Sequence, residues 1–252
     1  MKDLFLPISF ASKFPVLAGI TTGSAGNSKL TEKRIEIAHQ LNISYSRITT
    51  GEQVHKNNIA TVRENDLGRR FPATDGLITA LRNVPLAIFT ADCPPVFLLD
   101  PQRKIVGLLH AGWRSTVANI SSRAVEIMLE TFGVKPDSLF VVIGPHICKK
   151  CYGVSWSPVA KAFTECFKSF GKEALASIIS EVPQPKPQAS QKNFWCVDLA
   201  RANAYQLERA GVPPGNIEIS TICTYEDKNF FSYRRDKASA GRLMALIELH
   251  FS

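Results

Sequence analysis

The chain has 252 residues, of which 45% are hydrophobic and 21% are charged. That length is ample for a buried core, and the composition excludes disorder over most of the chain. Every apolar run is shorter than the roughly 18 residues that span a bilayer, so we expect no membrane segment.

The chain is basic, with 30 Lys and Arg against 22 Asp and Glu, which favours anionic partners. The basic residues are scattered, and their densest clusters are the pairs Arg69–Arg70, Lys149–Lys150 and Arg234–Arg235, so we expect no nucleic-acid binding. Six Cys are too few for a disulfide scaffold. The segment Met1–Phe14 lacks a signal-peptide pattern. We therefore expect a cytoplasmic protein whose thiols are buried, metal-bound or catalytic.

Helical and strand signals are interleaved along the chain. Periodicity and capping residues predict helices over Thr31–Leu41, over Ser115–Phe132 with Gly133 as its cap, from Ser157–Pro158 to Gly171, and from Asp198 to Gly211. Strands are predicted over Pro85–Phe89, Val96–Leu99, Ile105–Leu109, Leu139–Ile143, Ile217–Ile222 and Leu243–Leu249. Short turns between strands favour a mixed sheet in one α/β or α+β domain covering residues 1–252. Three prolines predict a surface loop over 182–193.

The segment from Thr90 to Arg114 predicts a hairpin that brings a thiol close to an imidazole. If Asp100 faces Arg103 across a two-residue turn, Cys93 faces His110 with Cβ atoms about 5 Å apart, a spacing that one metal ion can bridge. Pro101 does not suit the turn types that two-residue hairpins prefer, so a bulge that shifts the register by one residue is the alternative. A thiolate and an imidazole together favour zinc or copper over magnesium or calcium.

A catalytic zinc site has three protein ligands and an open position, so one more ligand must come from elsewhere. His39 in a helix and His250 near the end of a strand are expected to be structural. His55 lies in a polar, loop-like region and His146 follows a strand, and spacing alone does not choose between them. The alternative is that the cysteine and histidine of the hairpin are ordinary core residues.

Several motifs from residue 53 onward occur together in one order. They are Gln53–Val54–His55, Thr74–Asp75–Gly76 with Thr79, Ala91–Asp92–Cys93–Pro94–Pro95–Val96, His110–Ala111–Gly112–Trp113–Arg114, Ile143–Gly144–Pro145–His146–Ile147 with Cys151–Tyr152, Cys223–Thr224–Tyr225, Phe231–Ser232–Tyr233–Arg234–Arg235–Asp236, and Gly241–Arg242. With them the chain resembles the YfiH/YlmD-type laccase-domain proteins of the polyphenol oxidase family, which are also called peptidoglycan editing factors and purine nucleoside phosphorylases.

The resemblance implies a four-layer α/β/β/α fold and one zinc ion held by His55, Cys93 and His110, with a substrate pocket beside it. It also implies phosphorolysis of adenosine, inosine, guanosine or methylthioadenosine, with some deamination of adenosine. The expected partners are a small-molecule nucleoside and phosphate, and the expected state is a monomer or a homodimer.

Arginine suits a phosphate site because its planar fork grips phosphate oxygens. Arg114 is the first candidate, because it lies where a strand leads into a helix whose N–H groups also favour anions. Arg234 and Arg235 follow an aromatic-rich segment and are further candidates. The alternative for each is a structural ion pair.

Asp75 and Asp92 are candidates for general acid–base catalysis or for holding ribose hydroxyls. Asp92 adjoins Cys93, so its alternative role is to orient a metal ligand. Asp75 lies in an Asp-Gly turn, and its alternative role is simply to form that turn.

The chain departs from the family pattern at Lys56, Ser115, Gly153 and Ala240. The shortened segment 20–26 also lacks the arginine expected there, so we expect substrate binding to differ more than metal binding. The pair Cys148 and Cys151 has the spacing of a zinc knuckle or a redox pair. Because no second cysteine pair completes a knuckle, we interpret these two thiols as structural.

Three other functions compete with the phosphorylase. A copper-dependent polyphenol oxidase is disfavoured because the chain has five His, too few for a blue-copper centre together with an imidazole-rich cluster. A cysteine hydrolase acting on a peptidoglycan precursor would use Cys93 as nucleophile and His110 as base. A binding protein that kept the metal and lost catalysis is the third alternative.

Overall fold

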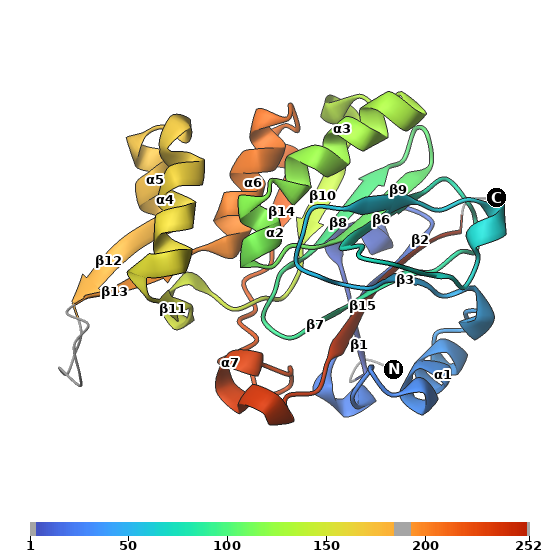
Figure 1. Cartoon of the computed structure of the whole chain (residues 1–252). Helices are drawn as coiled ribbons and strands as arrows, with labels where there is room; N and C mark the ends of the chain where they lie inside the picture. Colours follow the sequence, from blue (N-terminus) through green and yellow to red (C-terminus); the bar gives the residue numbers. More distant parts are fainter. Residues whose placement is uncertain (1–3, 184–192, 251–252) are drawn as a thin grey trace.

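The computed structural model describes residues 4–183 and 193–250. Two six-stranded sheets form the centre (Figure 1). The first has the strand order β1 (Phe5–Pro7), β2 (Val16–Thr21), β15 (Leu243–Leu249), β7 (Leu86–Thr90), β3 (Thr49–Gly51) and β5 (Arg70–Phe71). The second has the order β14 (Ile217–Ile219), β10 (Phe140–Ile143), β8 (Pro95–Asp100), β9 (Ile105–His110), β6 (Gly76–Thr79) and β4 (Ile59–Thr61). Both sheets are mixed, as the sequence predicts.

Helices cover the outer faces of the two sheets. The described part of the chain contains the helices α1 (Thr31–Gln40), α2 (Trp113–Val117), α3 (Ile120–Phe132), α4 (Lys161–Phe167), α5 (Lys172–Ile178), α6 (Leu199–Arg209) and α7 (Tyr233–Asp236), and three of them cover these sheets. Helix α1 packs on the first sheet, and α3 and α6 pack on the second. The order is therefore helix, sheet, sheet, helix, which confirms the predicted four-layer α/β/β/α fold.

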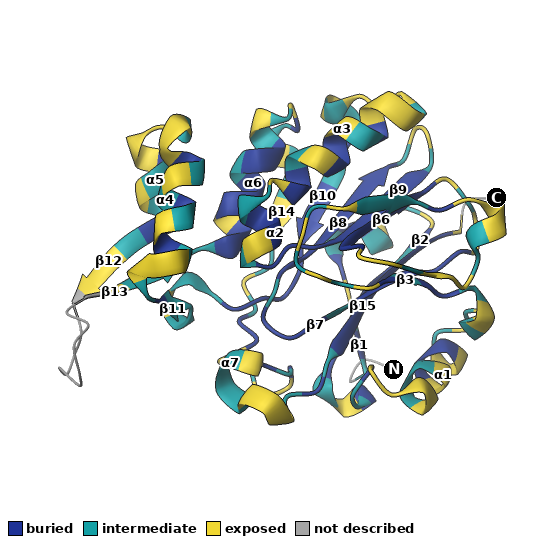
Figure 2. Cartoon of the chain, viewed as in Figure 1, coloured by how far each residue is buried: buried dark blue, intermediate teal, exposed yellow. Residues whose placement is uncertain are grey.

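The main core lies between the two sheets. Ile20 and Ile247 of the first sheet pack in one cluster with Phe97 and Leu108 of the second. Every residue of β8, β9 and β15 is buried, since these strands are covered on both faces. Such strands read as continuous apolar runs, which is why the sequence signals them clearly. Figure 2 shows the burial concentrated in the sheets and the exposed residues on the outward sides of the helices.

The predicted helix over Ser115–Phe132 is wrong in one respect, because the chain forms two helices there. Helix α2 ends at Val117 and α3 begins at Ile120, and Asn119 between them has a left-handed φ of 68°. Asparagine adopts this conformation more readily than most residues. Gly133 caps α3 with a φ of 64°, and Asp198 caps α6 by accepting a hydrogen bond from the Arg201 N–H at 2.8 Å, as predicted.

A small third sheet extends the fold at one end (Figure 1). It consists of β11 (Gly153–Val154), β13 (Asn193–Val197) and β12 (Ile179–Pro183), and it packs with α4 and α5 around its own apolar cluster. The ends of the predicted loop 182–193 therefore belong to strands, and residues 184–192 lie outside the described residues. The third predicted helix, from Ser157–Pro158 to Gly171, corresponds to α4 and the short helical turns on either side of it. Gly171 ends it as predicted, and α5, which follows directly, was not predicted.

Within residues 4–183 and 193–250, no helix has both the length and the apolar character needed to cross a membrane.

Neighbouring residues of α3 give a direct test of the packing between this helix and the second sheet. Met128 is fully buried there, whereas Leu129 is 48% exposed. Met128→Ala should lower the free energy of unfolding by about 2–5 kcal/mol because it leaves a cavity. Leu129→Ala should change it by no more than about 0.5 kcal/mol. Urea unfolding of the two variants measures both values, and equal losses would contradict this packing.

Candidate metal centre and active site

The hairpin of β8 and β9 brings Cys93 and His110 together in a register that differs from the predicted one. Pro95, not Cys93, pairs with His110, so the predicted register is wrong by two residues. The turn is longer than predicted, because Asp100 pairs with Ile105. The Asp100 carboxylate accepts hydrogen bonds from backbone N–H groups inside this turn. Cys93 therefore lies just before β8, and His110 ends β9.

Three donor side chains converge at this end of the second sheet. The ligand atoms of His55, Cys93 and His110 all lie within 4.8 Å of one another. His146 is not part of this group, since its Nδ1 is 2.9 Å from the Gly144 carbonyl oxygen in a buried position. The geometry thus favours His55 over His146, a choice that spacing alone left open. One thiolate and two imidazoles form a three-ligand set that fits zinc with one coordination position open.

A glycine makes room for the three donors. A Cβ atom added to Gly112 would lie 3.0 Å from the Cys93 sulfur and 3.0 Å from Cδ2 of His55. Its distance to Cε1 of His110 would be 3.7 Å. The backbone at the start of α2 is therefore packed directly against the donor group, and no larger residue fits there without displacing it.

Asp75, just before β6, positions two of the three donors. Its carboxylate lies 3.0 Å from Nδ1 of His110, so the other ring nitrogen faces Cys93. The same carboxylate accepts hydrogen bonds from the backbone N–H groups of Val54, His55 and Lys56 at 2.9–3.0 Å. These bonds hold His55 in a left-handed conformation with a φ of 59°. Asp75 is 1% exposed, so it acts through His110 and His55 and not directly on a substrate.

The charges of these groups reinforce one another. Burial opposes ionisation of Cys93, but the imidazoles of His110 and His55 outweigh it and lower the thiol pKa to about 6. Burial also opposes protonation of His110, but the Cys93 sulfur and the Asp75 carboxylate raise its pKa to about 9. The site therefore stabilises a thiolate, which is the form that binds a metal ion.

A cleft with a volume of about 1230 Å³ opens beside the three donors. Seven basic side chains line it: Lys29, Arg34, Arg70, Arg114, Arg234, Lys237 and Arg242. Four aromatic side chains line it as well: Phe89, Trp113, Tyr152 and Tyr233. Among the described residues, the only carboxylate in this lining is that of Asp92. Such a cleft suits a small molecule that has both an anionic group and a flat ring.

Two of the three arginines that the sequence suggests for substrate binding, Arg114 and Arg234, line this cleft in different environments. Arg114 is exposed in the first turn of α2, with its guanidinium 4.3 Å from the centre of the Trp113 ring. Within the described part of the chain it has no carboxylate partner. Arg234 donates one hydrogen bond to the Gly153 carbonyl oxygen at 2.7 Å and lies 5.0 Å from the centre of the Tyr152 ring. Both guanidinium groups line the cleft.

Arg235 does not line the cleft, so its assignment to substrate binding is corrected. Its guanidinium donates hydrogen bonds to the backbone oxygens of Thr224, Tyr225 and Phe230. It also donates two hydrogen bonds of 2.9 Å to the carboxylate of Asp236. These contacts fold the segment before α7, which is the structural role that the sequence left as the alternative.

Asp92 braces the loop that carries Cys93. One carboxylate oxygen accepts a hydrogen bond from the Thr224 hydroxyl at 2.8 Å, and the other accepts one from the Arg234 N–H at 2.6 Å. Its backbone oxygen accepts a third from the Ile147 N–H at 3.0 Å. Its φ of 87° is a left-handed conformation that these bonds stabilise. The geometry supports the positioning role over general acid–base catalysis.

Sequence reasoning missed several residues of the cleft. The Gln53 side chain forms two hydrogen bonds of 2.7 Å with the backbone N–H and carbonyl oxygen of Phe89, so it pairs with β7 as a neighbouring strand would. Lys29 and Arg34 supply charge from the N-terminal region. The arginine expected within residues 20–26 is absent, and these two cations lie at the cleft instead. Only Gln53 belonged to a recognisable motif, and nothing in the pattern around the other two indicated a site.

Comparison with known proteins agrees with this architecture. A family model described as multi-copper polyphenol oxidoreductase laccase matches residues 21–250. The purine nucleoside phosphorylase YlmD of Geobacillus stearothermophilus is 32% identical, with 92% of this chain and 89% of that protein covered. The adenosine deaminase RL5 of an unknown prokaryotic organism is 31% identical, with 85% and 79% covered. The crystal structure of YfiH from Bacillus licheniformis superposes with a TM-score of 0.84 at 28% identity, covering 98% and 97%. These matches confirm the resemblance to the YfiH/YlmD-type proteins.

Gly112→Ala tests how closely the backbone is packed against the donor group. The added methyl group should displace Cys93 or His55 and weaken zinc binding by about tenfold or more, the size of effect seen when groups next to metal ligands are disturbed. Gly215→Ala is the control, since its Cβ would meet nothing within 4 Å. Competition with a chromogenic chelator measures both affinities. Unchanged zinc affinity in a folded Gly112→Ala protein would contradict the site geometry.

Proposed function

The chain belongs to the multi-copper polyphenol oxidoreductase laccase family, and we propose that this member is a zinc-dependent purine nucleoside phosphorylase with some adenosine deaminase activity. One observation carries the proposal: a one-cysteine, two-histidine donor group lies beside a cationic cleft with aromatic side chains. The names of the relatives support the same reaction, because one is a purine nucleoside phosphorylase and another an adenosine deaminase.

His55, Cys93 and His110 are the residues that we assign to the metal. When bound, zinc supplies Lewis acidity to a substrate or water atom in its open position. The chain's own contribution is to hold the three donors in place through Asp75 and Gly112 and to keep Cys93 ionised.

The basic residues of the cleft suit the phosphate co-substrate. Arg114 and Arg234 bring guanidinium groups to the cleft, where they can hold phosphate oxygens next to C1′ of the ribose. In phosphorolysis a phosphate oxygen bonds to C1′, the bond from C1′ to N9 of the purine breaks, and its electron pair leaves with the purine. The purine gains the proton that phosphate loses, and the products are ribose 1-phosphate and the free base.

Aromatic side chains of the cleft suit the purine. Stacking on rings such as Phe89 or Trp113 contributes about 1–3 kcal/mol for each base. Burial raises the pKa of Tyr152 well above its ordinary value, so its hydroxyl stays protonated and can donate a hydrogen bond to the departing purine. Deamination of adenosine in the same cleft adds a water oxygen to C6, and the exocyclic nitrogen leaves as ammonia.

Two other functions have an observation in their favour. The name of the family favours a copper oxidase, but among the described residues the group of candidate metal ligands beside the cleft contains only two imidazoles. The close approach of the Cys93 sulfur to the His110 imidazole favours a cysteine hydrolase. Zinc and an electrophile would compete for the same sulfur, so metal-loaded protein would be a poor hydrolase.

A nucleoside assay tests the proposed reaction. Zinc-loaded protein should release hypoxanthine from inosine in phosphate buffer and not in a phosphate-free buffer, and Cys93→Ala should lower the rate to background. Cys166→Ala is the control, since Cys166 lies in α4 and is not one of the three candidate metal ligands. Liquid chromatography of the reaction mixture measures the product. Inactivity of the zinc-loaded wild type over a panel of purine nucleosides would contradict the proposal, and phosphate-independent turnover that iodoacetamide blocks would favour the hydrolase.

Arg114→Ala tests the assignment of the phosphate. Removing a guanidinium that forms charge-assisted hydrogen bonds should weaken phosphate binding by about 1.5–3 kcal/mol, which raises the KM for phosphate by roughly 10- to 100-fold. Arg123→Ala is the control, because Arg123 pairs with Glu126 on the exposed face of α3. Initial rates at varied phosphate concentration give both constants. An unchanged KM for phosphate in Arg114→Ala would contradict the assignment.

A further inference from the structure

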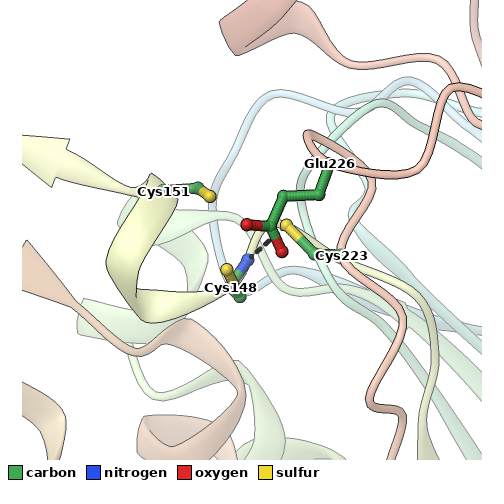
Figure 3. A group of neighbouring side chains, drawn as sticks. All are labelled: Cys148, Cys151, Cys223 and Glu226. Atoms are coloured by element: carbon green, nitrogen blue, oxygen red, sulfur yellow. Dashed lines mark hydrogen bonds between the residues drawn. The ribbon is translucent and has the colours of Figure 1, made fainter.

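The described residues contain a second group of metal-ligating side chains. The ligand atoms of Cys148, Cys151, Cys223 and Glu226 all lie within 4.8 Å of one another. Figure 3 shows the three sulfur atoms and the carboxylate gathered around one point. None of the four residues lines the cleft. The thiols that the sequence suggested were structural therefore have a third cysteine and a carboxylate beside them, which come from a segment more than 70 residues later.

The backbone brings these two segments together. His146 and Cys223 form a parallel bridge, and the Thr224 N–H donates to the His146 carbonyl oxygen at 3.0 Å. The N–H of Cys148 donates to the sulfur of Cys223 at 3.3 Å. Cys148 directly precedes a single short helical turn, Lys149–Cys151, and Cys151 is the last residue of that turn. The fold thus brings all four donors together next to a short, hydrogen-bonded bridge.

We propose that Cys148, Cys151, Cys223 and Glu226 bind a second zinc ion as a closed, structural site. Three thiolates and one carboxylate are a four-ligand set that zinc accepts in tetrahedral geometry. Zinc–sulfur bonds of about 2.3 Å separate the donors of a tetrahedral site by about 3.8 Å. The donor atoms of this group lie within 4.8 Å of one another, so side-chain rotations that move these atoms by about 1 Å would complete the site.

Charge also favours a cation at this position. Three sulfurs and a carboxylate this close repel one another when ionised, and a divalent ion removes that repulsion. Lys150 lies 2.8 Å from Oε1 of Glu226 and offsets part of the remaining negative charge. We assign Oε2 of the same carboxylate to the ion. A disulfide would use only two of the three sulfurs, whereas a metal ion uses all four donors of the group.

The second ion would stabilise the wall of the active site. Ile147, next to Cys148, donates its N–H to the backbone oxygen of Asp92. Thr224, next to Cys223, donates its hydroxyl to the carboxylate of Asp92. A zinc ion that joins these two segments therefore fixes the residue immediately before Cys93. Its ligands do not touch the cleft, so its role is to position this loop.

The test is zinc content measured by mass spectrometry on full-length protein that was purified under reducing conditions without chelators. We expect two zinc ions per chain in the wild type and one in Cys93→Ala. The double variant Cys148→Ser/Cys151→Ser should also retain one. Cys166→Ser, which alters a thiol outside both groups, should retain two. If the double variant fails to fold, the wild type and Cys93→Ala still decide between one site and two.

Cobalt identifies the ligands of the ion that remains. Cobalt-loaded Cys93→Ala should show an intense near-ultraviolet band from charge transfer between several thiolates and Co²⁺, and the double variant should show a much weaker one from Cys93 alone. One zinc ion in the wild type with none in Cys93→Ala would overturn the proposal, as would the lack of a thiolate band in cobalt-loaded Cys93→Ala. Neither readout depends on nucleoside turnover, so the second site can fail while the phosphorylase proposal stands, and the reverse.

Discussion

A single buried carboxylate organises the metal centre. Asp75 binds the imidazole of His110 and three successive backbone N–H groups of the loop that carries His55. Burial alone would raise the pKa of this carboxyl, but the hydrogen bonds and the charge of His110 outweigh burial and hold the pKa below its ordinary value. An ionised carboxylate is tolerated inside a protein only when it is paired in this way. Two of the three proposed ligands therefore depend on one charge.

The loop around Cys93 depends on a second carboxylate. Asp92 holds the segments that contain Ile147, Thr224 and Arg234 against this loop. The proposed second zinc ion would tie two of these segments together through side chains that do not line the cleft. The two metal groups are thus connected through the hydrogen bonds of Asp92, and the cationic cleft opens where α2, the loop of Cys93 and the start of α7 meet.

Much of the fold could be predicted because its central strands are continuous apolar runs. The register of β8 and β9 could not, since the turn after Asp100 contains four residues in place of two, and composition does not distinguish the two lengths. The break at Asn119 was also hidden, because helical periodicity continues on both sides of it. At the site, the motifs indicated the three residues that lie together as candidate metal ligands. They could not separate Arg234, which lines the cleft, from Arg235, which binds the backbone behind it. Adjacent residues look equivalent in a sequence until their neighbours in space are known.

The central claim is that one metal ion lies among His55, Cys93 and His110. Anomalous diffraction from crystals of zinc-loaded protein, recorded on both sides of the zinc absorption edge, tests it most directly. The account predicts an edge-dependent peak within about 2.0–2.4 Å of the Cys93 sulfur and of one nitrogen on each imidazole. Full zinc content with no such peak at these three side chains would contradict it.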